Sequence, residues 1–126
     1  MACMRQRRVG GLTSLAWMLL LTACNSEPPA LQIEKVCVSD SGMSTYDVRL
    51  NTAGRRGTIR YMYMGQDIRY AVNRMTVDGS VVSGEALFAG SATGETRGTP
   101  ILFRYDHQAD VFEDGQTTAR CRSPQR

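Results

Sequence analysis

Histidine, lysine and tryptophan are nearly absent from this chain. It has one histidine, one tryptophan and one lysine, Lys35, so that arginine supplies almost all of its positive charge. The only histidine, His107, lies in a polar stretch, and no serine stands in a G-x-S-x-G elbow or an S-x-x-K pair. A hydrolase needs a nucleophile, a base and an oxyanion donor together, and no segment assembles that set. We therefore expect a binding protein without a cofactor rather than an enzyme.

Metal-binding patterns are equally scarce. The four cysteines form no closely spaced pair, and the single histidine supplies no second ligand. Four acidic residues do cluster near the C-terminus, at Asp106, Asp110, Glu113 and Asp114. Their spacing does not match an EF-hand loop. We expect a solvated acidic face there, with weak cation binding as the alternative, and no metal site.

No apolar run is long enough to span a bilayer. The longest, from Leu12 to Leu21, has about ten residues, whereas a transmembrane helix needs about 20. Three arginines precede it, which is the pattern of a secretory signal peptide over residues 1–23. The next residues, Leu21-Thr22-Ala23-Cys24, resemble the bacterial lipobox. We expect cleavage before Cys24, lipid on its thiol, and a membrane anchor made by the acyl chains.

The residues after Cys24 predict where and how the protein is held. Residues 24–30 contain two prolines and suit a short tether, followed by one domain over residues 31–126. By resemblance to the sorting rules of enterobacterial lipoproteins, Asn25 rather than aspartate after the lipidated cysteine implies the outer membrane, facing the periplasm. Loss of the signal removes three arginines and leaves 12 basic and 12 acidic residues. The basic character therefore belongs to the signal, and we expect no binding to nucleic acid.

The remaining cysteines predict one disulfide. Cys3 is removed with the signal and Cys24 carries lipid, which leaves Cys37 and Cys121. Two thiols in the oxidising periplasm most simply form a disulfide, here close to both ends of the folded region. A metal site is the alternative, but no second pair of ligands occurs at the usual spacing.

The pattern of the domain is that of an all-β protein. Tyr46, Val48 and Leu50 alternate with polar residues, and no segment sustains an apolar helical period. Asp78-Gly79 and similar pairs between the segments are typical of tight hairpins. We expect eight antiparallel strands that form a small barrel or a sandwich. Their predicted ranges are 31–39, 44–50, 58–64, 67–76, 81–89, 100–105, 109–112 and 117–122.

Two connections offer alternative interpretations. Gly90–Thr99 is rich in glycine and polar residues, and we favour a flexible hairpin connection over a binding loop. Gly54-Arg55-Arg56-Gly57 is interpreted as a hairpin tip with two solvated charges, although two adjacent arginines could also clamp an anion.

Several motifs follow one another in a recognisable order. After the lipobox and the tether come Cys37 in the first strand, V-R-L-N at 48–51, Ser83-Gly84, and F-x-x-x-x-x-A-x-V-F at 103–112 before Cys121. With these motifs, most of the chain after the signal resembles the membrane-bound inhibitors of c-type lysozyme. Those inhibitors are small lipoproteins whose eight-stranded β-barrel is closed by one disulfide.

The resemblance implies a binding site and a target. In that family, the serine of a Ser-Gly-x-x-Tyr loop and a lysine from a later strand enter the lysozyme cleft. Ser83 and Gly84 match the loop, Leu87 replaces its tyrosine, and Arg104 is the cation nearest to the lysine's place. The implied function is inhibition of a lysozyme or another peptidoglycan-cleaving enzyme by plugging its active-site cleft.

Three alternatives share the expected envelope location. The chain could be an immunity protein that neutralises a secreted peptidoglycan hydrolase, or an accessory lipoprotein of an outer-membrane machine. A carrier of small ligands is the third, but a barrel of this size normally fills with its own side chains.

Overall fold

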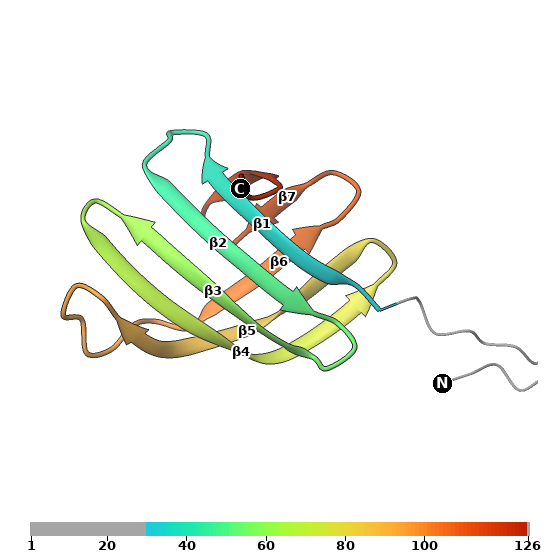
Figure 1. The fold of residues 1–126 in the computed structure, drawn as a ribbon, viewed down its shortest axis with the longest axis horizontal. Coiled ribbons are helices and arrows are strands. Elements are labelled where there is room, and N and C mark those ends of the chain that lie inside the picture. Colours follow the sequence, from blue (N-terminus) through green and yellow to red (C-terminus); the bar gives the residue numbers. More distant parts are fainter. Residues whose placement is uncertain (1–29, 126) are drawn as a thin grey trace, which may run out of the picture.

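A computed structural model describes residues 30–125, which form a closed eight-stranded antiparallel barrel (Figure 1). The predicted signal peptide, Cys24 and the tether up to residue 29 lie outside the described residues. In chain order, the strands are β1 (Gln32–Ser39), β2 (Ser44–Asn51), β3 (Arg56–Tyr63), β4 (Gln66–Asp78), β5 (Val81–Ser91), β6 (Ile101–Asp106), β7 (Val111–Glu113) and β8 (Thr118–Arg122).

Pairing between the first and last strands closes the barrel. Each strand pairs with its neighbour in the sequence, and β8 returns to pair with β1 from Val36 to Ser39. Closure leaves no strand of the described barrel without a neighbour on either side, although β3 pairs with β4 only up to Ala71. The predicted all-β fold is confirmed, and of the two architectures left open by the sequence, the structure has the barrel.

The interior is filled by the alternating apolar residues of the strands. Tyr46, Val48 and Leu50 of β2 are fully buried, as the sequence pattern predicts, and Tyr105 and Phe112 meet them from β6 and β7. All buried apolar residues lie between Ile33 and Ala119. The strands, the buried core and both paired cysteines lie within residues 31–122.

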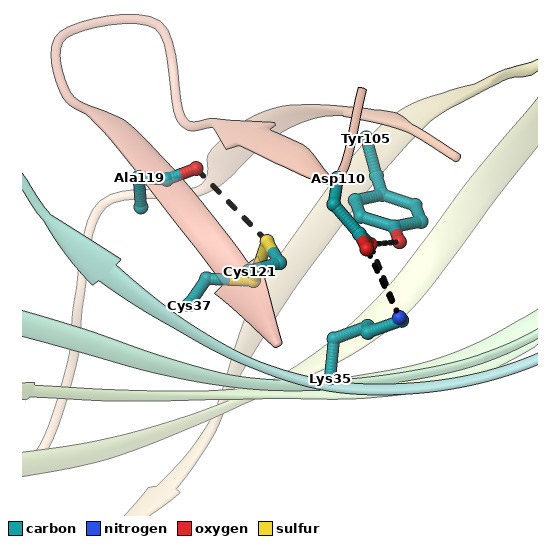
Figure 2. The surroundings of a disulfide bond; sticks show 6 residues. All are labelled: Lys35, Cys37, Tyr105, Asp110, Ala119 and Cys121. Carbon is teal, nitrogen blue, oxygen red and sulfur yellow. Dashed lines mark hydrogen bonds and ion pairs between the residues drawn. A yellow bond between two sulfur atoms is a disulfide. The ribbon is translucent and has the colours of Figure 1, made fainter. Parts of the chain in front are cut away.

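A disulfide joins the two strands at the closure (Figure 2). Cys37 of β1 and Cys121 of β8 are directly opposite each other, with their Cα atoms 3.9 Å apart and 84 positions apart in sequence. The predicted disulfide is confirmed. Across residues 30–125 the chain forms no helix long and apolar enough to cross a membrane.

Candidate functional site

Ser83 and Arg104 are brought together by strand pairing. They lie directly opposite each other on β5 and β6. Their neighbours Val82, Phe103 and Tyr105 point into the core, so the alternation of the strands turns Ser83 and Arg104 to the outer surface. Directly opposite residues have Cβ atoms about 5 Å apart. A hydroxyl and a guanidinium group therefore stand side by side on one face of the barrel.

Both groups can bind a partner. The Nη1 atom of Arg104 is 3.9 Å from the Oε2 atom of Glu113, and about half of each side chain is exposed. An exposed ion pair at that distance contributes little, so it does not immobilise the guanidinium group. Within residues 30–125, the Ser83 hydroxyl donates no hydrogen bond to another residue. The pair thus presents a free hydroxyl donor beside a cation.

Gly84 is required by an irregularity in the neighbouring strand. The pairing of β4 with β5 shifts between Val72 and Arg74, where β4 forms a bulge. A Cβ atom on Gly84 would lie only 1.8 Å from the carbonyl oxygen of Arg74. The Ser-Gly step that the sequence singled out therefore has a structural cause. Glycine lets β4 approach β5 closely, and Ser83 is held in register beside that contact.

An exposed leucine on β6 lies beside this pair and was not predicted as part of the site. Leu102 of β6 lies one outward step from Arg104 and is 65% exposed. Leu87, which replaces the family's tyrosine, is also exposed, on β5. Leu102 alternates with the buried Ile101 and Phe103, so its outward position was predictable from the strand pattern. The resulting surface combines hydrogen-bond donors with exposed apolar area, as protein interfaces do.

A second polar cluster lies at the barrel end near the disulfide (Figure 2). Lys35 sits on an inward position of β1, and its Nζ atom is 3.1 Å from Asp110, which also accepts a hydrogen bond from the Tyr105 hydroxyl. Burial alone would raise the pKa of Asp110, but the bonds from Tyr105 and Lys35 lower it below its usual value. Burial and then Asp110 raise the pKa of Tyr105. The cluster connects β1 to the β6–β7 turn.

Three of the four C-terminal acidic residues accept hydrogen bonds within the fold, although Asp110 and Glu113 are also partly exposed to solvent, as expected. Asp106 accepts hydrogen bonds from two turn amides, and the bond from Ala109 is the largest cause of its lowered pKa. Asp114 accepts the N–H groups of the last turn and, at 2.5 Å, the hydroxyl of the buried Tyr46. In the described part of the chain, no three His, Cys, Asp or Glu side chains are placed to hold a metal ion.

The glycine-rich connection is shorter than predicted. Gly90 and Ser91 belong to β5, which leaves residues 92–100 as the loop. Its first part is fastened to β4, because the Thr93 hydroxyl accepts the amide of Asp67. Hydrogen bonds from Ser91 and then Thr93 lower the pKa of Glu95. These bonds fix the start of the loop to the barrel.

His107 is exposed, as the sequence suggested. Its ring centroid is 6.4 Å from that of Tyr105, in an edge-on arrangement. Among residues 30–125, no hydrogen bond joins its imidazole to a nucleophilic side chain.

Comparison of this chain with protein-family models, with curated proteins and with solved structures found no match.

Proposed function

We propose that this protein is an envelope lipoprotein that binds a lysozyme or another peptidoglycan-cleaving enzyme and inhibits it by plugging the active-site cleft. The pairing of Ser83 with Arg104 on the outer face of β5 and β6 carries the proposal. The resemblance to the lysozyme inhibitors selects this serine and this cation from the sequence, where they lie far apart. Strand pairing places them side by side, as joint insertion into one cleft requires.

The spacing of the pair suits the chemistry of the target. Retaining glycosidases such as lysozyme have two carboxyl groups about 5 Å apart. Ser83 and Arg104 are directly opposite each other, and the flexible side chain of Arg104 allows its guanidinium group to lie about that far from the Ser83 hydroxyl. The Ser83 hydroxyl can donate to one carboxyl group while the guanidinium group of Arg104 binds the other. Because such charge-assisted bonds strengthen when water is excluded, occupation of the cleft keeps the glycan out.

The exposed leucines complete the surface. Leu102 and Leu87 lie on the same outer face, and their burial against the walls of a cleft would contribute hydrophobic free energy. It would also remove water from around the charged pair. The lipid on Cys24 would hold this surface at the outer membrane, facing the periplasm, where peptidoglycan-cleaving enzymes act.

Inhibition by the soluble domain tests the proposal. A chain that starts at Asn25 is titrated into c-type lysozyme, and into a panel of secreted peptidoglycan hydrolases, with lysis of cell-wall suspensions as the readout. We expect Arg104→Ala to weaken inhibition about tenfold or more, since a desolvated carboxylate loses its partner. Arg104→Lys keeps part of the activity, and Arg120→Ala on β8 is the matched control. Unchanged lysis by every enzyme at a large excess of the domain contradicts the proposal.

The membrane anchor has a separate test. Mass spectrometry of the full chain expressed in a bacterium should detect cleavage before Cys24 and three added acyl chains. The Cys24→Ser variant should stay unprocessed and lack the acyl chains. A wild-type chain that keeps its first 23 residues would contradict the anchor without affecting the inhibition assay.

A further inference from the structure

The outer face of β2, β3 and β4 carries a shallow groove with a floor of small side chains. Thr58 and Ala71 lie directly opposite each other on β3 and β4, and Ala89 is exposed on β5. Small residues at adjacent outward positions leave a depression that larger side chains would fill. The depression consists of two adjoining hollows that share Arg49 and Thr58.

Arginines surround both hollows. One hollow is lined by Arg49 and Arg56, and the other by Arg49, Arg60 and Arg69. Arg60 and Arg69 are directly opposite each other on β3 and β4. Like charges in that position repel and weaken a sheet. At Arg60 this repulsion is offset by the hydrogen bond to Asp67 and by Asp47, which lies directly opposite on β2, and together they raise the pKa of Arg60.

The nearby carboxylates neutralise only part of this charge. Asp67 holds Arg60 through two hydrogen bonds, of 2.8 and 2.5 Å, and the bond from Arg60 is the largest cause of the lowered pKa of Asp67. Asp47 lies 3.5 Å from Arg49. Within residues 30–125, Arg56 and Arg69 take part in no ion pair. Each hollow thus keeps one guanidinium group without an acidic partner.

We propose that this groove binds a saccharide that carries two phosphate groups, one in each hollow. Arginine binds phosphate through two parallel hydrogen bonds, and Arg49 lies where the hollows meet. Arg56 and Arg60 are four residues apart on one strand, or about 13 Å. That span suits two phosphates joined by a sugar better than a single phosphate. The Thr58 hydroxyl on the shared floor can bond to the sugar between them.

Both hollows have a mostly apolar floor with arginines at its border, and among the described residues no large exposed apolar side chain projects from them. The large exposed apolar residues in the described part of the chain are Met43, Met64, Leu87 and Leu102, and none of them lines either hollow. The bordering guanidinium groups suit phosphate groups, and the small floor leaves room for a sugar ring between them. The arginines of the groove also lie on β2, β3 and β4, and β2 and β3 are drawn in front of β6 in Figure 1. The hollows share no residue with the proposed inhibitory surface, although Leu87 of that surface lies directly opposite Ala71 of the groove floor. Substitution of Arg56 and Arg69 leaves both of these residues unchanged, so the two surfaces can be tested separately.

Calorimetric titration at low ionic strength tests the proposal with a chain that starts at Asn25. The probes are fructose 1,6-bisphosphate and inorganic phosphate, and we expect the bisphosphate to bind about tenfold more tightly or better. Arg56→Ala combined with Arg69→Ala should weaken its binding about tenfold or more. The matched control, Arg120→Ala with Arg122→Ala on β8, changes the net charge equally and should bind as the wild type does.

Several outcomes would overturn the proposal. Equal affinities for the two probes would remove the argument for two linked phosphates. Equal losses of bisphosphate affinity in the two double variants would show that binding depends on net charge and not on the groove. If the domain sedimented with phosphatidylglycerol–phosphatidylcholine vesicles but did not bind the bisphosphate, the arginines would be binding lipid headgroups instead of a phosphorylated saccharide. Lysozyme inhibition should be the same in the Arg56→Ala/Arg69→Ala variant and the wild type, so this proposal can fail without the proposed function.

Discussion

Removal of the disulfide should cost the domain a large part of its stability. Cys37 and Cys121 are 84 positions apart, and in the chain-entropy model a bridge over that length destabilises the unfolded state by about 4.5 kcal/mol. Domains of this size have a total free energy of unfolding of about 5–15 kcal/mol. The strand pairs between β1 and β8 remain after reduction, so the barrel can still close. We therefore expect a folded but much weaker protein, with a melting temperature lower by about 20 °C or more.

Urea unfolding of the soluble domain, followed by circular dichroism with and without dithiothreitol, measures this loss. The double variant Cys37→Ala/Cys121→Ala is the control. Its free energy of unfolding should match that of the reduced wild type within about 1 kcal/mol and should not change when dithiothreitol is added. Alanine is the appropriate replacement because Cys37 is fully buried and a serine hydroxyl there would lack a partner. The reasoning is refuted if the oxidised and reduced proteins unfold at the same urea concentration.

Three further predictions address single side chains. Gly84→Ala should destabilise the domain by about 2–3 kcal/mol in urea unfolding because its Cβ would meet the backbone of β4, whereas Gly54→Ala, which meets only a flexible side chain, should cost less than about 1 kcal/mol. Asp110 has a lowered pKa when folded, so its stabilisation is complete above its unfolded pKa of about 4 and is lost as the pH falls through the folded value. Asp110→Asn should therefore flatten the acid side of a plot of melting temperature against pH; an unchanged slope would contradict this. Tyr46→Phe removes the bond to Asp114 and should cost about 1–2 kcal/mol, and no loss would show that water replaces that bond.

The strand pattern was predictable because alternation alone decides which residues face the core. Tyr46, Val48 and Leu50 show how a local period of two gives both the strand and its buried side. The longer extents of β4 and β5 were not predicted, because turn-forming residues such as Asp78 and Gly90 take part in the strand pairing. The choice between barrel and sandwich was also beyond the sequence, because closure depends on pairing between the two ends of the chain.

The inward position of Lys35 was missed for a similar reason. A charged residue is rarely buried unless it is paired, and its partner Asp110 lies 75 positions away. The alternation along β1 placed Lys35 between the inward Ile33 and Cys37 and so indicated an inward side chain. The positive charge of Lys35 argued against that position. Likewise, the sequence supplied Ser83 and Arg104 only as separate candidates, and their pairing follows from the register of β5 with β6.

The geometry of a closed barrel links the disulfide to both proposed surfaces. In a closed sheet, the strand number and the stagger between strands together fix the register around the whole circumference. The pairing of Ser83 with Arg104, and of Thr58 with Ala71, therefore depends on closure at β1 and β8, although neither pair lies at that seam. Reduction of Cys37 and Cys121 should accordingly weaken inhibition and saccharide binding together, and only to the extent that the barrel unfolds. Substitutions on β5–β6 or β2–β4 should instead impair one activity and leave the other intact.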